Sequence, residues 1–124
     1  SRPLLLPPDA AVGPAWSVIY LLTAIAAVRV WLRAALPHHR LQWLGALAAN
    51  GALNVLWSWL FFKARRPDWA LAEVGVLWLS IGLLILLARR DDAIAALLLV
   101  PYLMWVAFAA SLNQAVVRMN GPFA

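Results

Sequence analysis

Cysteine is absent from this 124-residue sequence, which also has only two histidines and five acidic residues. Without cysteine the chain has no disulfide, no thiol nucleophile and no thiolate metal ligand. His38 and His39 are adjacent in a short polar stretch, so they cannot share the helix face that a metal site needs, and we expect both to be solvated loop residues. The sequence also lacks paired carboxylates at a site and a glycine-rich phosphate loop. It therefore predicts no metal centre and names no catalytic residues.

Charge is scarce, at 12% of residues, whereas 65% are hydrophobic. Soluble domains are about half apolar and about a quarter charged. A membrane-spanning helix needs about 20 apolar residues, so the chain has material for roughly four spans. The net charge of +5 comes from basic clusters between apolar runs, which is typical of loops facing lipid headgroups and does not favour nucleic-acid binding. These features predict a multi-pass integral protein of the lipid bilayer, and the Ala/Arg/Leu-rich usage suggests a bacterial source.

Proline and charged clusters divide the chain into segments. Pro3, Pro7 and Pro8 predict an irregular segment over residues 1–12, and Pro14 suits the first turn of the helix that follows. Asp68 and Asp92 are suited to cap the third and fourth helices. The prediction is an all-α bundle of four antiparallel transmembrane helices, with both termini on one side and a tail at 118–124. The expected helices span about 13–36, 41–62, 69–88 and 93–117.

Polar and aromatic residues of all four helices share the membrane half nearest the N-terminus, if depth is counted at 1.5 Å per residue. They include Trp16, Tyr20, Asn54, Trp57, Trp105 and Asn113. Packing can explain any one of them, but together they indicate an aromatic pocket that opens toward that side. Asn50, Asn54 and Ser58 share a face of the second helix, where hydrogen bonds between helices are the alternative. Glu73 either lies inside the bundle or reaches the membrane interface.

Four segments resemble the tryptophan-rich sensory protein and translocator protein family, also called TspO/MBR or peripheral benzodiazepine receptor. Residues 7–20, PPDAAVGPAWSVIY, are similar to the family pattern PPxxxFxPxWxxLY. Residues 54–62 (NVLWSWLFF), 66–73 (RPDWALAE) and 100–113 (VPYLMWVAFAASLN) resemble three further patterns, in family order. The family has five transmembrane helices, and from Ser1 the sequence has room for four, so we expect the family's first helix to be lacking.

The resemblance implies a pocket between the helices, closed by the proline-rich segment, for porphyrins, haem-like tetrapyrroles or similar flat apolar ligands. With Tyr20 added from the depth argument, the implied ligand-binding residues are Val12, Gly13, Ala15, Trp16, Tyr20, Asn54, Trp57, Trp69, Ala72, Val76, Trp105, Ala109, Leu112 and Asn113. Val12 and Trp59 depart from the family's phenylalanine and proline. The family's sterol-associated pattern lacks its tyrosine in residues 114–118, so the resemblance does not support sterol recognition.

Three hypotheses follow for function. The first is a receptor or sensor that binds a tetrapyrrole and requires no other cofactor. The second is a photo-oxidative, porphyrin-degrading enzyme, in which Trp16 and Trp105 match tryptophans linked in the family to light-dependent porphyrin breakdown. The third is a structural or accessory subunit of a larger membrane complex. For the third we expect an uncovered groove between the first and last helices, where Ala107, Ala110 and Ser111 contact another transmembrane helix of a second copy or of a different subunit.

Overall fold

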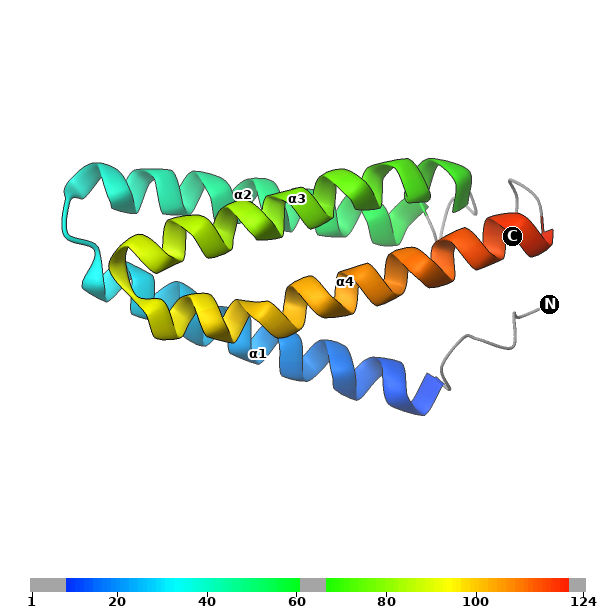
Figure 1. The fold of residues 1–124 in the computed structure, drawn as a ribbon, viewed down its shortest axis with the longest axis horizontal. Helices are drawn as coiled ribbons and strands as arrows, with labels where there is room; N and C mark the ends of the chain where they lie inside the picture. Colours follow the sequence, from blue (N-terminus) through cyan, green and yellow to red (C-terminus); the bar gives the residue numbers. More distant parts are fainter. Residues whose placement is uncertain (1–8, 61–66, 121–124) are drawn as a thin grey trace.

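The computed structural model describes residues 9–60 and 67–120. It contains the helices α1 (Asp9–Arg33), α2 (Pro37–Ser58), α3 (Pro67–Asp91) and α4 (Ala93–Asn120), with no strand among the described residues. The helices run lengthwise beside one another, and the α1–α2 and α3–α4 connections lie at the same end of the bundle (Figure 1). The predicted all-α fold class is confirmed.

The helices begin and end at somewhat different residues than the sequence pattern predicts. α1 begins at Asp9, so Pro14 lies inside the helix and not in its first turn. Ala10 and Ala11 favour this extension, because alanine has the highest helix propensity. α2 begins at Pro37, whose fixed φ suits a first helical position, so His38 and His39 belong to a helix and not to a loop. Three parts of the predicted segments lie outside the described residues: residues 1–8 of the irregular segment, residues 61–62 of the second helix and residues 121–124 of the tail.

The two predicted aspartate caps have different outcomes. Asp92 lies between α3 and α4, and its Oδ1 accepts a hydrogen bond from the backbone N–H of Ile94 at 3.0 Å, as expected of a helix cap. Asp68 is instead the second residue of α3, because that helix begins at Pro67. A proline at the first position needs no N–H partner, which lets the helix start one residue earlier.

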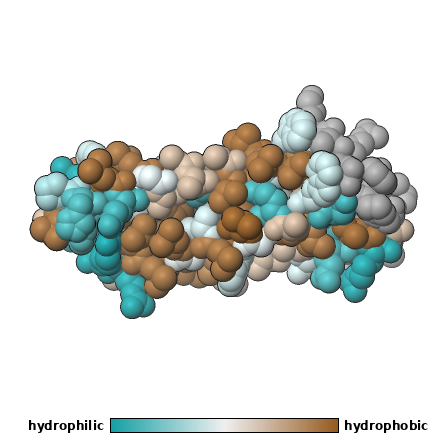
Figure 2. Space-filling view, turned by 90° about the horizontal axis from the view of Figure 1, so that it is seen from above, coloured by the Kyte–Doolittle hydropathy of each residue, from teal (hydrophilic) through white to brown (hydrophobic). Residues whose placement is uncertain are grey.

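The bundle has the surface expected of a membrane protein. Within the described residues, three segments are long and apolar enough to cross a membrane: Gly13–Arg33, Asp68–Asp91 and Ala93–Met119. α2 is not among them, because its polar residues, such as Gln42, Asn50 and Asn54, lower its hydropathy. Hydrophilic residues gather toward the two ends of the molecule, and hydrophobic ones predominate between them (Figure 2). An integral membrane location therefore follows from the elements themselves.

The four helices are not equally closely packed against one another. α4 packs extensively against α3 and along α1, and α2 packs against α3. The backbones of α1 and α2 are less closely packed, and these two helices meet mainly through side chains such as Trp43, whose Nε1 donates to the backbone oxygen of Ala27. In Figure 1, α2 accordingly runs along α3, and α1 runs along α4. α1 packs along α4, but Ala107 and Ser111 of α4 remain exposed, so the expected contact of this face with another transmembrane helix stays a prediction. The sparsely packed seam lies between α1 and α2.

The interior is built around one face of α3. Its buried side chains recur every three or four residues, and each is at most 2% exposed: Ala70, Val74, Leu77, Ile81, Leu84 and Ala88. Two buried clusters divide the length of the bundle. One includes Ile19, Trp57 and Tyr102 in the half nearest the start of α1, and the other includes Val30, Trp43 and Leu99 near the helix connections.

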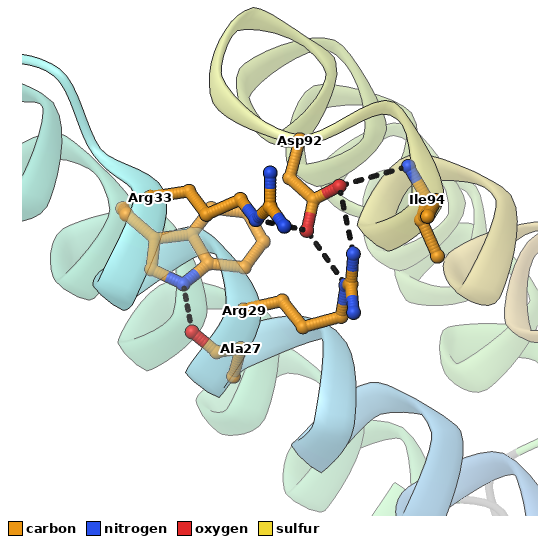
Figure 3. A network of polar contacts seen from close by, with 6 residues as sticks. Ala27, Arg29, Arg33, Asp92 and Ile94 are labelled. Carbon is orange, nitrogen blue, oxygen red and sulfur yellow. Dashed lines mark hydrogen bonds and ion pairs between the residues drawn. The ribbon is translucent and has the colours of Figure 1, made fainter.

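An ion-pair network fastens α1 to the turn between α3 and α4 (Figure 3). The Nε of Arg29 donates to Oδ2 of Asp92 at 2.7 Å, and its Nη2 donates to Oδ1 at 3.3 Å. Nε of Arg33 lies 3.9 Å from the same carboxylate. The hydrogen bond from Arg29 is the main reason that the pKa of Asp92 is held below its usual range.

A second contact at this end joins α2 to α3. His39 Nδ1 lies 3.0 Å from Oδ1 of Asp91, and that oxygen also accepts the backbone N–H of Ala35 at 3.2 Å. The His39 side chain is only 15% exposed, whereas His38 is exposed. The expectation that both histidines are solvated loop residues is thus wrong for His39, which bridges two helices.

Candidate functional site

An aromatic cluster forms where the first half of α1 meets the middle of α4. The Trp16 ring is stacked on Tyr20 with centroids 5.2 Å apart, and it meets Trp105 edge-on at 6.0 Å and Tyr102 edge-on at 6.4 Å. Trp105 in turn lies 5.5 Å from Phe108. Trp16 and Trp105 are both half-buried, so part of each ring is accessible. Such edge-on and offset contacts are the favoured aromatic geometries.

A chain of hydrogen bonds crosses the bundle beside this cluster. The Tyr20 hydroxyl donates to Oδ1 of Asn54 at 3.2 Å, and Nδ2 of Asn54 donates to the Tyr102 hydroxyl at 2.8 Å. The Tyr102 hydroxyl donates to Oδ1 of Asn50 at 3.1 Å, and Nδ2 of Asn50 donates to Oγ of Ser80 at 3.0 Å. The chain thereby links all four helices. It confirms that Asn50 makes hydrogen bonds between helices.

Asn113 and Trp57 form a second polar contact deep in the same half. The indole Nε1 of Trp57 donates to Oδ1 of Asn113 at 3.3 Å. Trp57 is 5% exposed and Asn113 is fully buried, so this pair joins α2 to α4 inside the core. The buried Ala109 lies one turn before Asn113 on α4 and belongs to the same buried hydrophobic cluster as Trp57.

Two polar groups near the cluster are buried and have no hydrogen-bond partner among residues 9–60 and 67–120. Nε1 of Trp105 is one, and the two carboxylate oxygens of Glu73 are the other. Glu73 lies one turn after Ala70 and one turn before Leu77, both fully buried, and it is near enough to interact electrostatically with Tyr102. Burying such groups unpaired costs free energy, which makes both of them candidates for contacts with a ligand. The carboxylate of Glu73 is thus buried against the other helices, although the residue as a whole is half-buried.

A cleft lies on the α1–α2 side of the hydrogen-bonded chain, with a volume of about 300 Å³. Tyr20, Thr23, Asn50 and Asn54 line it together with apolar side chains of α2. The hydroxyl oxygen of Thr23 is buried there without a hydrogen-bond partner. The polar chain therefore has one accessible edge in the seam where α1 and α2 diverge.

The remaining predicted residues lie in different surroundings. Gly13 is exposed with open space around it, and Ala15 and Leu112 are half-buried. Trp69, Ala72 and Val76 are exposed along α3. Val12 belongs to α1, but its side chain lies outside the described part of the chain. The structure thus brings together the tryptophans, Tyr20 and the asparagines, and leaves the α3 trio outside the buried cluster.

The described residues offer few side chains that could bind a metal ion. Within residues 9–60 and 67–120, no group of three or more histidine, aspartate or glutamate side chains could hold a metal ion. The described site is instead built from aromatic faces, amide groups and one carboxylate.

Comparison with known proteins decides the family. The model of the TspO/MBR family matches residues 1–119, which is nearly the whole chain. The chain belongs to the TspO/MBR family. Among its relatives, the tryptophan-rich sensory protein of Cereibacter sphaeroides is 36% identical over 120 residues, which cover 97% of this chain and 73% of that protein.

Two further relatives come from a bacterium and from a mammal. Protein CrtK of Rhodobacter capsulatus is 34% identical over 119 residues, covering 96% of this chain and 74% of that protein. The translocator protein of Sus scrofa is 35% identical over 120 residues, covering 96% of this chain and 71% of that protein. The family resemblance inferred from the four motifs is confirmed.

Sequence reasoning missed two polar members of the site. Tyr102 was part of the PYLMW motif but was not predicted to lie in the pocket, and Ser80 carried no motif at all. The signal for Tyr102 was available, because a tyrosine hydroxyl deep in a membrane helix needs a partner. Ser80 could have been found from its spacing of seven residues after Glu73, which puts both on one face of α3.

Proposed function

We propose that this TspO/MBR protein binds a flat apolar ligand with polar substituents, a tetrapyrrole such as a porphyrin, between α1 and α4, and that it has a sensing or regulatory role. The observation that carries the proposal is the indole N–H of Trp105, which is buried without an acceptor beside the exposed part of an aromatic cluster. A ligand that stacks on these rings and offers an oxygen to that N–H would satisfy both features.

Each group of the site has a task in this proposal. Trp16 and Trp105, perpendicular to each other at 6.0 Å, would hold the macrocycle by one face and one edge. The Trp105 N–H would donate to a carboxylate or carbonyl of the ligand. Asn54 and Tyr102 hold α2 and α4 together beside the site through their mutual hydrogen bond at 2.8 Å. The binding is thus mainly dispersion and apolar burial, with a few polar contacts that set orientation.

Titration with protoporphyrin in the dark tests the proposal. The purified protein in detergent or nanodiscs is titrated while quenching of tryptophan fluorescence and the Soret absorbance are followed. We expect saturable binding of one protoporphyrin per chain. Quenching that rises linearly without saturation, as with empty nanodiscs, would contradict the proposal.

Porphyrin degradation is the second candidate, and the direct contact of Trp16 with Trp105 favours it. Two indoles with centroids 6.0 Å apart are close enough to exchange an electron. The same titration repeated under illumination separates the candidates. Loss of the Soret band in the light that requires both tryptophans supports an enzyme, whereas a stable complex supports a receptor.

A contact with another transmembrane helix also stays a prediction. Ala107 and Ser111 are exposed one turn apart on α4, whereas Ala110 is half-buried against the core. The small exposed pair would let a second helix approach closely, from another copy or from a different subunit. A cysteine introduced as Ala107→Cys should form a cross-link to that helix in native membranes. Accessibility of this cysteine to lipid-soluble reagents alone would contradict the contact.

A further inference from the structure

The α1–α2 connection carries a hollow that the proposed ligand site does not use. It lies at the opposite end of the bundle from Trp16 and has a volume of about 470 Å³. Its wall combines Trp31 of α1, Leu36 of the connection, and Arg40 and Leu41 of α2. Leu36 and Leu41 are exposed, at 48% and 71%. An arginine, an indole and exposed leucines at the end of a spanning helix form an amphipathic surface at headgroup level.

Arg40 is held in position within this hollow. Its Nε donates to the backbone oxygen of Trp31 at 3.0 Å, and its guanidinium carbon lies 4.9 Å from the centre of the Trp31 ring. These contacts leave the two Nη groups without a protein acceptor in the described part of the chain. A guanidinium whose Nε is held by the backbone and whose two Nη groups are left open can donate two hydrogen bonds to a phosphate.

The acidic residues at this end are already engaged. Asp92 pairs with Arg29 at 2.7 Å, and Asp91 contacts His39 at 3.0 Å. Arg40, and likewise the exposed Arg89, form no ion pair with a carboxylate among residues 9–60 and 67–120. The end of the bundle keeps an excess of positive charge that favours an anionic ligand.

An apolar hollow continues from the first one along the seam between α1 and α2. It has a volume of about 190 Å³ and shares Trp31 with the basic hollow. Its other walls are Ala27, Val28, Trp43, Leu44 and Leu47, of which only the apolar surfaces are presented. A molecule bound here needs an anionic head of modest size and a hydrocarbon chain that points into the membrane.

We propose that the α1–α2 connection is a binding site for an anionic phospholipid, with its phosphate on Arg40 and one acyl chain against Trp31 in the apolar hollow. The charge of the mouth, the apolar continuation and the position at headgroup level all match this one ligand class. The site goes beyond the proposed tetrapyrrole function, because it uses none of the residues of the aromatic cluster.

Native mass spectrometry of the full chain in mild detergent tests the proposal. The protein is equilibrated with phosphatidylglycerol or with phosphatidylcholine of the same acyl chains. We expect one phosphatidylglycerol per chain to be retained, with at least tenfold preference over phosphatidylcholine. Arg40→Gln should abolish this preference. Arg90→Gln, which removes an equal charge at the same end but outside the hollow, should keep it.

Trp31 gives an independent spectroscopic readout. Phosphatidylglycerol brominated on one acyl chain should quench a saturable part of the tryptophan emission, and Trp31→Phe should remove that part. Inorganic phosphate at millimolar concentration should not compete, because it lacks the chain. Equal retention of both lipids, equal losses in Arg40→Gln and Arg90→Gln, displacement by phosphate alone, or a second copy of the chain in place of lipid would each overturn the proposal.

Discussion

Asn54 shows how a polar side chain is accommodated inside an apolar bundle. It is 8% exposed, accepts from Tyr20 on α1 and donates to Tyr102 on α4. Trp105 shows the opposite condition, because its indole N–H is buried without an acceptor. The spacing of Asn50 and Asn54 along α2 predicts their common face, but their shared partner Tyr102 lies 52 and 48 residues away, respectively, and could not be predicted. The paired groups of Asn54 stabilise the fold, whereas the unpaired N–H of Trp105 is the group that we propose to contact a ligand.

Trp105→Ala should weaken protoporphyrin binding at least tenfold while leaving the helical content unchanged. A tenfold loss corresponds to about 1.4 kcal/mol, which is the scale of one aromatic contact. Affinity is measured by fluorescence quenching, and helical content by circular dichroism. Trp31→Phe, at the far end of the bundle, is the control and should bind normally. Unchanged affinity in Trp105→Ala would remove this residue from the site.

Asn54→Leu should lower the stability of the bundle by about 1 kcal/mol, the usual size of hydrogen bonds between membrane helices. The substitution removes one acceptor for Tyr20 and one donor for Tyr102, although Tyr102 keeps its bond to Asn50. Thermal unfolding in detergent measures the effect. Gln42→Leu is the control, because Gln42 is exposed on the same helix. Equal midpoints for the two variants would mean that the Asn54 bonds add no stability.

At the scale of elements, α1 is attached to the rest of the bundle in two different ways. Its first half packs on α4 through Trp16, and its last turns are tied to the α3–α4 turn through Arg29 and Asp92. The cap at Asp92 was predictable from local sequence, since an aspartate before an apolar run is a helix start signal. Its pairing with Arg29 joins residues 63 positions apart and depended on the packing of α1.

The Asp92 ion pair should make stability depend on pH in the acidic range. Because the pKa of Asp92 is lowered in the folded protein, its contribution is fully present above the ordinary aspartate pKa of about 4 and is lost as pH falls below it. Asp92→Asn keeps a capping side chain but removes the charge. The melting midpoint of the wild type should therefore approach that of Asp92→Asn between about pH 4 and pH 2. A constant difference between the two across this range would contradict the ion-pair account.

At the scale of the whole molecule, α2 is the least apolar of the four described helices, and it contributes the largest number of buried polar side chains. It is not apolar enough by composition to count among the spans, yet it packs along α3 and supplies Asn50, Asn54 and Trp57 to the interior. Its polar groups are paired inside the bundle, which lowers the cost of placing them in the membrane. α2 therefore depends on its neighbours to cross the bilayer.

Single-cysteine labelling can test this arrangement, since the natural sequence contains no cysteine. His38→Cys and Arg90→Cys lie at the same end of the bundle, and Met119→Cys lies near the end of α4. With α2 as a full span, a membrane-impermeant maleimide should label positions 38 and 90 from one side of sealed vesicles and position 119 from the other. Labelling of positions 38 and 90 from opposite sides would show that the bundle does not cross the membrane as four antiparallel helices.

The sequence by itself determined that the chain is helical, membrane-embedded and a TspO/MBR family member. Long apolar runs separated by basic clusters leave few other structures in a bilayer, and motifs over nearly the whole chain leave little doubt about the family. It also predicted the half of the membrane in which Trp16, Asn54, Trp57, Trp105 and Asn113 gather. These conclusions rest on composition and local order, which the sequence contains directly.

Only the tertiary structure decided which helices are neighbours and which polar atoms stay unpaired. Helices that are apolar on most sides have no single face that dictates a partner, so the close contact of α1 with α4 and the open seam to α2 follow from side-chain fit. The same fit leaves the Trp105 N–H and the Glu73 carboxylate without partners and fixes Arg40 against Trp31. These features join residues far apart in the chain, and no local pattern encodes them.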